Sequence, residues 1–170
     1  MRLTEPLRDE HNELIPHIEK LRAVADSVGD VPIETLRHGV NEAYEFLTHH
    51  LIPHAEAEDH ALYPVVAKVM GTPGATATMS RDHVEVGRLT EELGRLRSQI
   101  AGGAVGESQL KALRRVLYGL YTLVGVHFAK EEEIYLPLLD AGLTPEEARR
   151  MFEQMEAAAE VARHQHTSST

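Results

Sequence analysis

The chain has 170 residues, of which 42% are hydrophobic and 26% charged, a composition that is ordinary for one globular domain. Its net charge of −10 argues against a nucleic-acid groove, because such a groove needs clustered Lys and Arg. The absence of cysteine excludes disulfides, thiolate zinc sites, iron–sulfur clusters and thiol nucleophiles. No cationic and then apolar leader opens the sequence, so we expect a cytoplasmic protein.

Glycine and proline divide the first half of the sequence into two helical stretches. The first begins with Thr4 as N-cap, and its helical spacing of apolar residues stops at Gly29. The second runs from residue 32 to residue 70 and contains Pro53. Because proline lacks an N–H and clashes with the preceding turn, we expect a kink or local break just before His54.

Three more helices are predicted after the loop at residues 71–74. One covers residues 78–101, and the next begins after Gly106 and continues to Leu139. The last is indicated by residues 144–147, where Thr-Pro-Glu-Glu combines an N-cap with acidic side chains at the positive end of the helix dipole. No segment alternates apolar and polar residues over the length of a strand.

Four long helices with short connections predict an all-α fold, an antiparallel up-and-down four-helix bundle with a short extra C-terminal helix. We expect the bundle over residues 1–140 and the C-terminal helix over 144–163, followed by a flexible tail over 164–170. The sequence leaves open whether the C-terminal helix packs on the bundle or on a partner copy.

An internal repeat organises the eleven histidines, an unusual number beside five Tyr and three Phe. Residues 54–64 and 127–137 share the pattern His-x-x-x-Glu-acid, followed by an apolar or aromatic pair and Pro. Residues 8–13 and 81–85 both begin with Arg-Asp and reach His-x-Glu. Duplicated helical hairpins pack around a pseudo-two-fold axis, which would bring the marked side chains to one place in the core.

The spacing has a chemical meaning, because residues four apart on a helix share one face. Two His-x-x-x-Glu pairs and two single histidines offer four imidazoles and two carboxylates, a set that suits Fe, Mn or Zn better than Mg or Ca. Two carboxylates can bridge two metal ions roughly 3.5–4 Å apart. The candidate metal ligands are His11, His54, Glu58, His83, His127 and Glu131.

In these segments the chain resembles hemerythrin-like proteins of the HHE cation-binding class, over residues 3–139, and its form around residues 51–64 is similar to the bacterial members. The resemblance implies a non-haem di-iron centre with two Fe per chain, in which the imidazoles anchor the irons. Glu58 and Glu131 would be the bridging carboxylates. Zinc or a single iron are the substitutes to expect in place of the native pair.

The chain also departs from the oxygen carriers of this family, which resemble a five-His set with His-x-x-x-His on the third helix. Here the position four residues after His83 is Gly87, which cannot ligate a metal. The resemblance therefore favours a type that does not carry oxygen and has an open coordination position. The candidates for a seventh ligand are His50, Tyr44, Tyr118 and Tyr121.

The expected function is the binding or redox processing of a small oxidant (O2, peroxide or nitric oxide), in oxidative or nitrosative stress, with an unidentified electron donor. Peroxidase-like or catalase-like activity is one form of it, and non-catalytic sensing or storage of oxygen or iron is the alternative. We expect no nucleic acid or membrane as partner, and a monomer or a homodimer. Ferritin-like Glu-x-x-His and zincin His-Glu-x-x-His motifs are absent from the sequence.

Several side chains near the candidate ligands have a plainer explanation. Glu10, Glu13, Asp82 and Glu85 are either a solvated helix face or partners of the ligands. Asp59 and Glu132 directly follow the two bridging acids, which allows the same supporting role. The remaining histidines are expected to face solvent, and these are His17, His38, His49, His60, His164 and His166.

Overall fold

The computed structural model describes residues 2–103 and 105–167. Regular structure over these residues is entirely helical, which confirms the all-α prediction. A helix both long and apolar enough to cross a membrane is not found among them.

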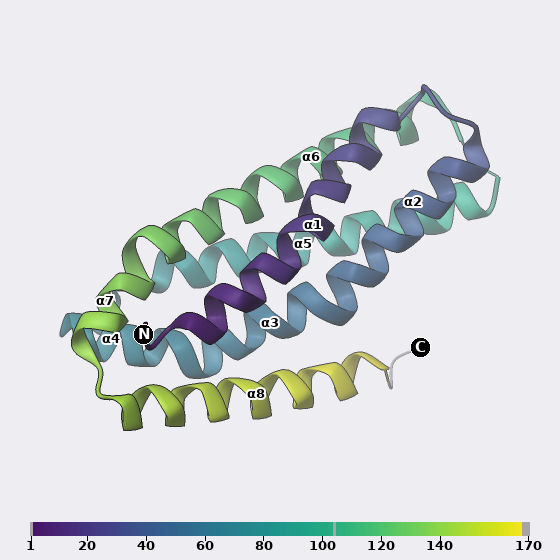
Figure 1. Cartoon of the computed structure of the whole chain (residues 1–170). Helices are drawn as coiled ribbons and strands as arrows, with labels where there is room; N and C mark the ends of the chain where they lie inside the picture. The colour runs from purple at the N-terminus through teal and green to yellow at the C-terminus, as the bar shows by residue number, and fades with distance from the viewer. Residues whose placement is uncertain (1, 104, 168–170) are drawn as a thin grey trace.

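Three π-helical turns, η1 to η3, interrupt the α-helices (Figure 1). They join α2, α3 and α4 into one continuous stretch and α6 and α7 into another. The helical segments are α1 (Glu5–Ser27), α2 (Ile33–Phe46), η1 (Leu47–Leu51), α3 (Ile52–Ala57), η2 (Glu58–Leu62), α4 (Tyr63–Met70), α5 (Ala77–Ala101), α6 (Glu107–Lys130), η3 (Glu131–Tyr135), α7 (Leu136–Gly142) and α8 (Pro145–Thr167).

Each π turn ends two residues before a proline, namely Pro53, Pro64 or Pro137. A proline ring conflicts with the carbonyl four residues earlier, and a turn with i→i+5 hydrogen bonds relieves that conflict without ending the helix. The local break expected before His54 is therefore the π turn η1. The other two π turns begin at Glu58 and Glu131, two of the candidate ligands.

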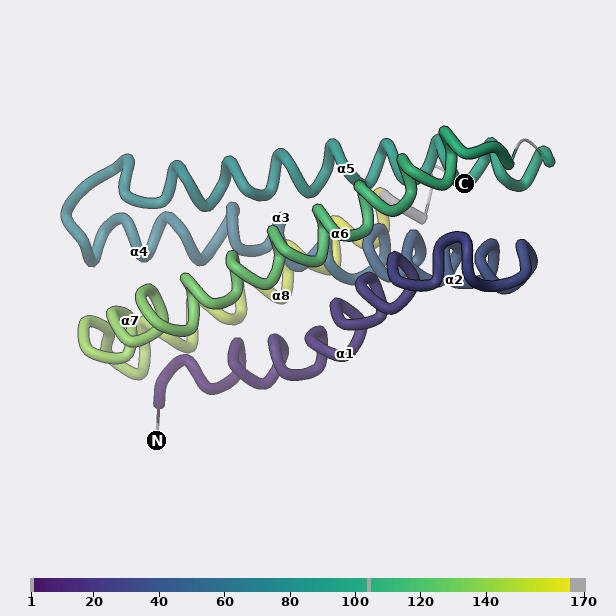
Figure 2. The backbone as a smooth tube through the Cα atoms, turned by 90° about the horizontal axis from the view of Figure 1, so that it is seen from above, coloured from purple at the N-terminus to yellow at the C-terminus, as the bar shows by residue number. Residues whose placement is uncertain are grey.

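The four long stretches pack side by side, and α8 lies outside them (Figures 1 and 2). Helix α1 contacts α2 and α6, while α5 contacts α2 and α6 on the opposite side. The beginning of the chain is held beside α7, because the backbone N–H of Thr4 donates to Asp140 Oδ1 at 2.8 Å. The Thr4 hydroxyl donates to Asp140 Oδ2 at 3.0 Å.

The apolar core is divided into two clusters, and in each long stretch at least one candidate ligand lies between them. In α1, Leu7 belongs to one cluster and Leu14 to the other, with His11 between them. In α5, Met79 and Val86 belong to different clusters in the same way. A buried polar layer therefore crosses the apolar interior.

Helix α8 packs along α3 and η2, the segments that carry His54 and Glu58. Its buried face consists of Ala148, Met151, Met155 and Ala162. The helix runs on to Thr167, so residues 164–167 of the predicted tail are helical. Residues 168–170 lie outside the described part of the chain.

Met151→Ala should lower the free energy of unfolding by about 2–5 kcal/mol, because this side chain is 1% exposed and its loss leaves a cavity between α8 and the rest of the core. Val161→Ala on the same helix, at 57% exposure, should change it by no more than about 0.5 kcal/mol. Chemical denaturation measures both variants. Equal stability of the two would contradict the packing of α8 described here.

Candidate metal centre

All six candidate ligands meet in the buried polar layer, and each long stretch contributes at least one of them. His11 comes from α1 and His83 from α5. The other two stretches each supply a histidine followed four residues later by a glutamate, and both glutamates are 0% exposed. The predicted convergence of these side chains is thus what the structure shows.

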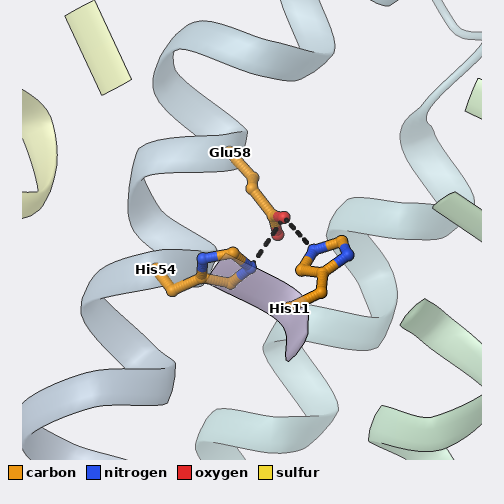
Figure 3. Close-up of side chains that lie close together, drawn as sticks. All are labelled: His11, His54 and Glu58. Atoms are coloured by element: carbon orange, nitrogen blue, oxygen red, sulfur yellow. Dashed lines mark ion pairs between the residues drawn. The ribbon is translucent and has the colours of Figure 1, made fainter. Parts of the chain in front are cut away.

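The first group of donor atoms surrounds one edge of the Glu58 carboxylate (Figure 3). His54 Nε2 lies 2.9 Å from Glu58 Oε1, and His11 Nε2 lies 3.7 Å from the same oxygen. His11 Nε2 also lies 3.3 Å from Oε2 of Glu131. His11, His54 and Glu58 place one donor atom each close enough to share a metal ion.

The second group surrounds the other edge of the same carboxylate. His83 Nε2 and His127 Nε2 lie 3.2 Å and 3.8 Å from Glu58 Oε2, and 3.0 Å from each other. His127 Nε2 lies 3.3 Å from Glu131 Oε1. Each carboxylate therefore turns one oxygen toward the His11/His54 pair and the other toward the His83/His127 pair.

A carboxylate on the outer nitrogen fixes the direction of every imidazole in the cluster. The four Nδ1 contacts are 2.7 Å from His11 to Glu132, 2.9 Å from His54 to Glu10, 2.8 Å from His83 to Asp59 and 2.9 Å from His127 to Asp82. With Nδ1 donating outward, each Nε2 is left to face the centre as an electron-pair donor, the arrangement found around protein-bound metals.

These outer contacts follow the internal repeat. Glu10 and Asp82 each precede a single histidine and support the His-x-x-x-Glu histidine of the same half. Asp59 and Glu132 each follow a buried glutamate and support the single histidine of the opposite half. All four acids are therefore partners of the cluster, whereas Glu85 pairs with Arg88 at the surface.

Cations and hydroxyls around the outside balance some of this negative charge. Arg8 pairs with Glu132, and Lys130 pairs with Asp82. Ser80 donates its hydroxyl to Asp59 at 2.6 Å. Two of the four outer carboxylates are thus neutralised by a neighbouring cation.

The inner atoms of the cluster are short of hydrogen bonds. Among the described residues, the buried side-chain polar atoms without a hydrogen-bond partner are His11 Nε2, His54 Nε2, both oxygens of Glu58, Glu131 Oε2 and Arg8 Nε. All but the last face one another across the polar layer. Buried polar atoms are costly when unpaired, and a pair of metal cations would satisfy these five together, so the residues present fit such a pair.

The charges in the cluster depend strongly on one another. Burial disfavours the charged form of His11, but its contacts with Glu131 and Glu58 outweigh burial and raise the pKa to about 9. The same carboxylates raise the pKa of His127 to about 10. Burial opposes the charge on Glu58, yet His54, His11 and His127 hold its pKa well below the ordinary value. Protons take the place of cations in the metal-free cluster, so metal binding must displace them.

Sequence reasoning missed Tyr63, whose side chain is 2% exposed. Its hydroxyl donates to Glu131 Oε1 at 2.7 Å and lies 3.0 Å from His127 Nε2 and 3.3 Å from His83 Nε2. The sequence feature that could have identified Tyr63 is the proline one residue later. Pro64 is accommodated by the π turn η2, and i→i+5 spacing brings the fifth residue after Glu58 to the inner face.

The four residues proposed as a seventh ligand are used elsewhere. His50 is exposed, and its ring lies 6.3 Å from that of Phe46. The hydroxyls of Tyr118 and Tyr121 donate to Asp26 and Glu19. Tyr44 lies 4.5 Å from the Arg97 guanidinium. At Gly87 an added Cβ would meet nothing within 4 Å, so the position lacks a side chain although space exists for one.

Of the six histidines expected to face solvent, four are shown to do so. His17, His38, His60 and His164 are exposed, His49 is half-buried, and His166 lies outside the residues whose side chains are described.

A family model described as hemerythrin HHE cation binding domain matches residues 2–139 of the chain. The match ends within α7, so α8 lies outside it. Comparisons with curated proteins and with solved structures give no significant match.

Asp59→Asn should weaken metal binding by roughly 10–100-fold, because the amide no longer draws the outer proton of His83 as strongly as a carboxylate does. Glu85→Gln, which changes an acid on the same helix as His83 but outside the cluster, is the matched control. Competition with a chelator of known affinity measures both variants. Equal affinities would show that Asp59 has no part in orienting the cluster.

Proposed function

The chain belongs to the hemerythrin HHE cation-binding family, and we propose that it is a non-haem di-iron protein that binds or redox-processes a small oxidant, namely O2, peroxide or nitric oxide. The observation that carries this proposal is the pair of buried carboxylates, each with one oxygen toward the His11/His54 pair and the other toward the His83/His127 pair. We further propose that the four long stretches are an antiparallel up-and-down four-helix bundle, and that the protein works in the cytoplasm.

The donor atoms assign a role to each ligand. His11 and His54 would hold one iron, His83 and His127 the other, and Glu58 and Glu131 would bridge them. Imidazole with carboxylate suits iron, and two carboxylates can hold two ions together. When bound, the iron pair supplies the change of oxidation state and the coordination position that a small oxidant needs.

The chain's own residues prepare that position. The outer carboxylates hold the four imidazoles in one orientation, and the two apolar clusters above and below the layer exclude water. Tyr63 supplies a buried hydroxyl on the His83/His127 side, where it donates to Glu131 Oε1. On the opposite side the ring of Phe128 stacks on His11 at 4.2 Å and offers no donor atom.

This difference between the two sides supports a type other than the oxygen carriers. The position of the additional carrier histidine is Gly87, and Tyr63 is the side chain that approaches the cluster as a further donor. We therefore propose Tyr63 as the seventh ligand, in place of His50 and the other tyrosines. Consumption of hydrogen peroxide above that of free iron would distinguish redox processing from storage or sensing without turnover.

Protein purified without added metal should contain about two iron atoms per chain, as expected for a two-metal site, and Glu58→Ala should abolish the pair. This carboxylate faces all four imidazoles, so its removal takes away a donor from both positions. Elemental analysis and the absorption of the bridged ferric pair measure the loss. The control is Glu133→Ala, which removes an exposed acid from η3. Two irons retained in Glu58→Ala would refute the bridging role.

Tyr63→Phe should remove a visible absorption band of the ferric protein that arises from a phenolate on iron. Burial and the charges of Glu58 and Glu131 raise the pKa of Tyr63 far above its ordinary value. A bound cation would lower that pKa, because it stabilises the phenolate. Tyr135→Phe removes the hydroxyl of the half-buried tyrosine that ends η3 and should leave the band intact. A band unchanged in Tyr63→Phe would reduce this residue to a hydrogen-bond donor.

A further inference from the structure

A line of ionic and hydrogen-bonded contacts joins the beginning of the chain to His11. Arg8 pairs through Nη1 with Oε2 of Glu132, and the other oxygen of that carboxylate lies 2.7 Å from His11 Nδ1. Nη2 of Arg8 lies 3.5 Å from Oδ2 of Asp140. Asp140 in turn accepts the two hydrogen bonds from Thr4. Arg8 therefore lies between a carboxylate that contacts the cluster and a carboxylate that does not.

The position of Arg8 follows from one extra residue in the first half of the internal repeat. Arg8 stands three residues before His11. Arg81, its counterpart in the second half, stands two residues before His83. Residues three apart on a helix are neighbours, whereas residues two apart point to different sides. The side chain of Arg8 is accordingly only 12% exposed, while that of Arg81 is 64% exposed and lies 3.8 Å from Glu85.

Arg8 is also the more buried of the two cations that pair with outer carboxylates of the cluster. Lys130, which pairs with Asp82, has a side chain that is 33% exposed. Solvent and salt screen a buried charge less than an exposed one. The positive charge of Arg8 therefore acts on the cluster with less screening than the charge of Lys130.

The contact with Glu132 gives this charge a chemical effect on His11. A carboxylate on Nδ1 makes an imidazole a stronger electron donor, because it draws the Nδ1 proton away from the ring. Arg8 shares the carboxylate with His11 and so weakens that pull. A nearby positive charge also opposes any increase of positive charge on an ion at His11. Both effects favour the ferrous over the ferric state of an iron held there.

We infer that Arg8 is a positioning residue that acts through Glu132 and raises the reduction potential of the ion on the His11/His54 side. The inference rests on the proposed function for the identity of the ion, and on the contacts of Arg8 for the direction of the effect. Asp140 limits the effect, because its negative charge offsets part of the charge of Arg8.

Substitutions of opposite sign test the inference. Arg8→Gln removes the positive charge and should lower the midpoint potential of the iron-loaded chain by about 59 mV, which corresponds to a roughly tenfold change in the ratio of ferric to ferrous affinity. Asp140→Asn removes the negative charge that offsets Arg8 and should raise the potential. Arg8→Lys keeps the charge and should stay close to the wild type. The exposed Arg81→Gln is the matched control, and spectroelectrochemical titration measures every chain.

A second measurement needs no iron. In the zinc-loaded chain, the position of the proton resonance of His11 Nδ1–H reports the pull of Glu132. Arg8→Gln should move this resonance downfield, because Glu132 is then no longer shared, while Arg81→Gln should leave it in place. Circular dichroism and thermal melting confirm that each variant folds. If Arg8→Gln does not fold, Asp140→Asn tests the inference alone, since it should move the resonance upfield.

The outcomes separate the two proposals. Equal potentials in the wild type and Arg8→Gln, shifts of the same sign in Arg8→Gln and Asp140→Asn, or an unmoved His11 resonance overturn the inference and leave the proposed function intact. A chain that binds zinc but no iron overturns the proposed function, and the His11 resonance then decides the role of Arg8 by itself. A chain that binds neither metal overturns both.

Discussion

The structure depends on the cost of keeping two carboxylates fully buried. Glu58 and Glu131 lie at 0% exposure in the middle of a helical protein, where an unpaired charge would be expensive. Four imidazoles surround them, and four outer carboxylates in turn hold the imidazoles. Removing any one member leaves another buried group without its partner, so the layer is stable only as a whole. This explains why the polar layer interrupts the apolar core in all four long stretches.

The internal repeat builds such a layer by using one short sequence pattern twice. Each half contributes one single histidine and one His-x-x-x-Glu pair, and the acid next to each ligand supports a different imidazole. The contacts from Asp59 to His83 and from Glu132 to His11 cross between the halves. Neither half can orient its own single histidine, so the folded arrangement of the two hairpins is a condition for a complete set of donor atoms.

The sequence was sufficient to predict the helices and the meeting of the six inner residues. The helical spacing of apolar residues, the positions of Gly and Pro and the internal repeat can all be read directly from the chain. It was insufficient wherever a backbone departs from α-helical spacing. His50 shares a face with His54 only in a regular helix, but it lies within the π turn η1, two residues before Pro53 and outside α3, which contains His54. Tyr63 was missed for the same reason, since η2 moves the inner position from the fourth to the fifth residue after Glu58. The supporting acids were ambiguous, because an acid that only faces solvent and an acid that contacts a ligand look alike in one sequence.

The two halves of the repeat are not equivalent, and they differ in which residue directly precedes the proline after the buried glutamate. Both π turns begin at a buried glutamate and are followed by proline, so the residue directly before each proline takes the same place in its half. In the first half that residue is Tyr63, with its hydroxyl among the donor atoms. In the second half it is Leu136, fully buried in the apolar cluster beside α8. Tyr135 stands one position earlier, where the turn leaves it half-buried. One exchange of neighbouring residues therefore gives a symmetric ligand set an asymmetric environment, with a polar donor near one pair of imidazoles and only a phenyl face near the other. A small molecule that binds at an open coordination position would therefore meet a different environment at each of the two pairs of imidazoles.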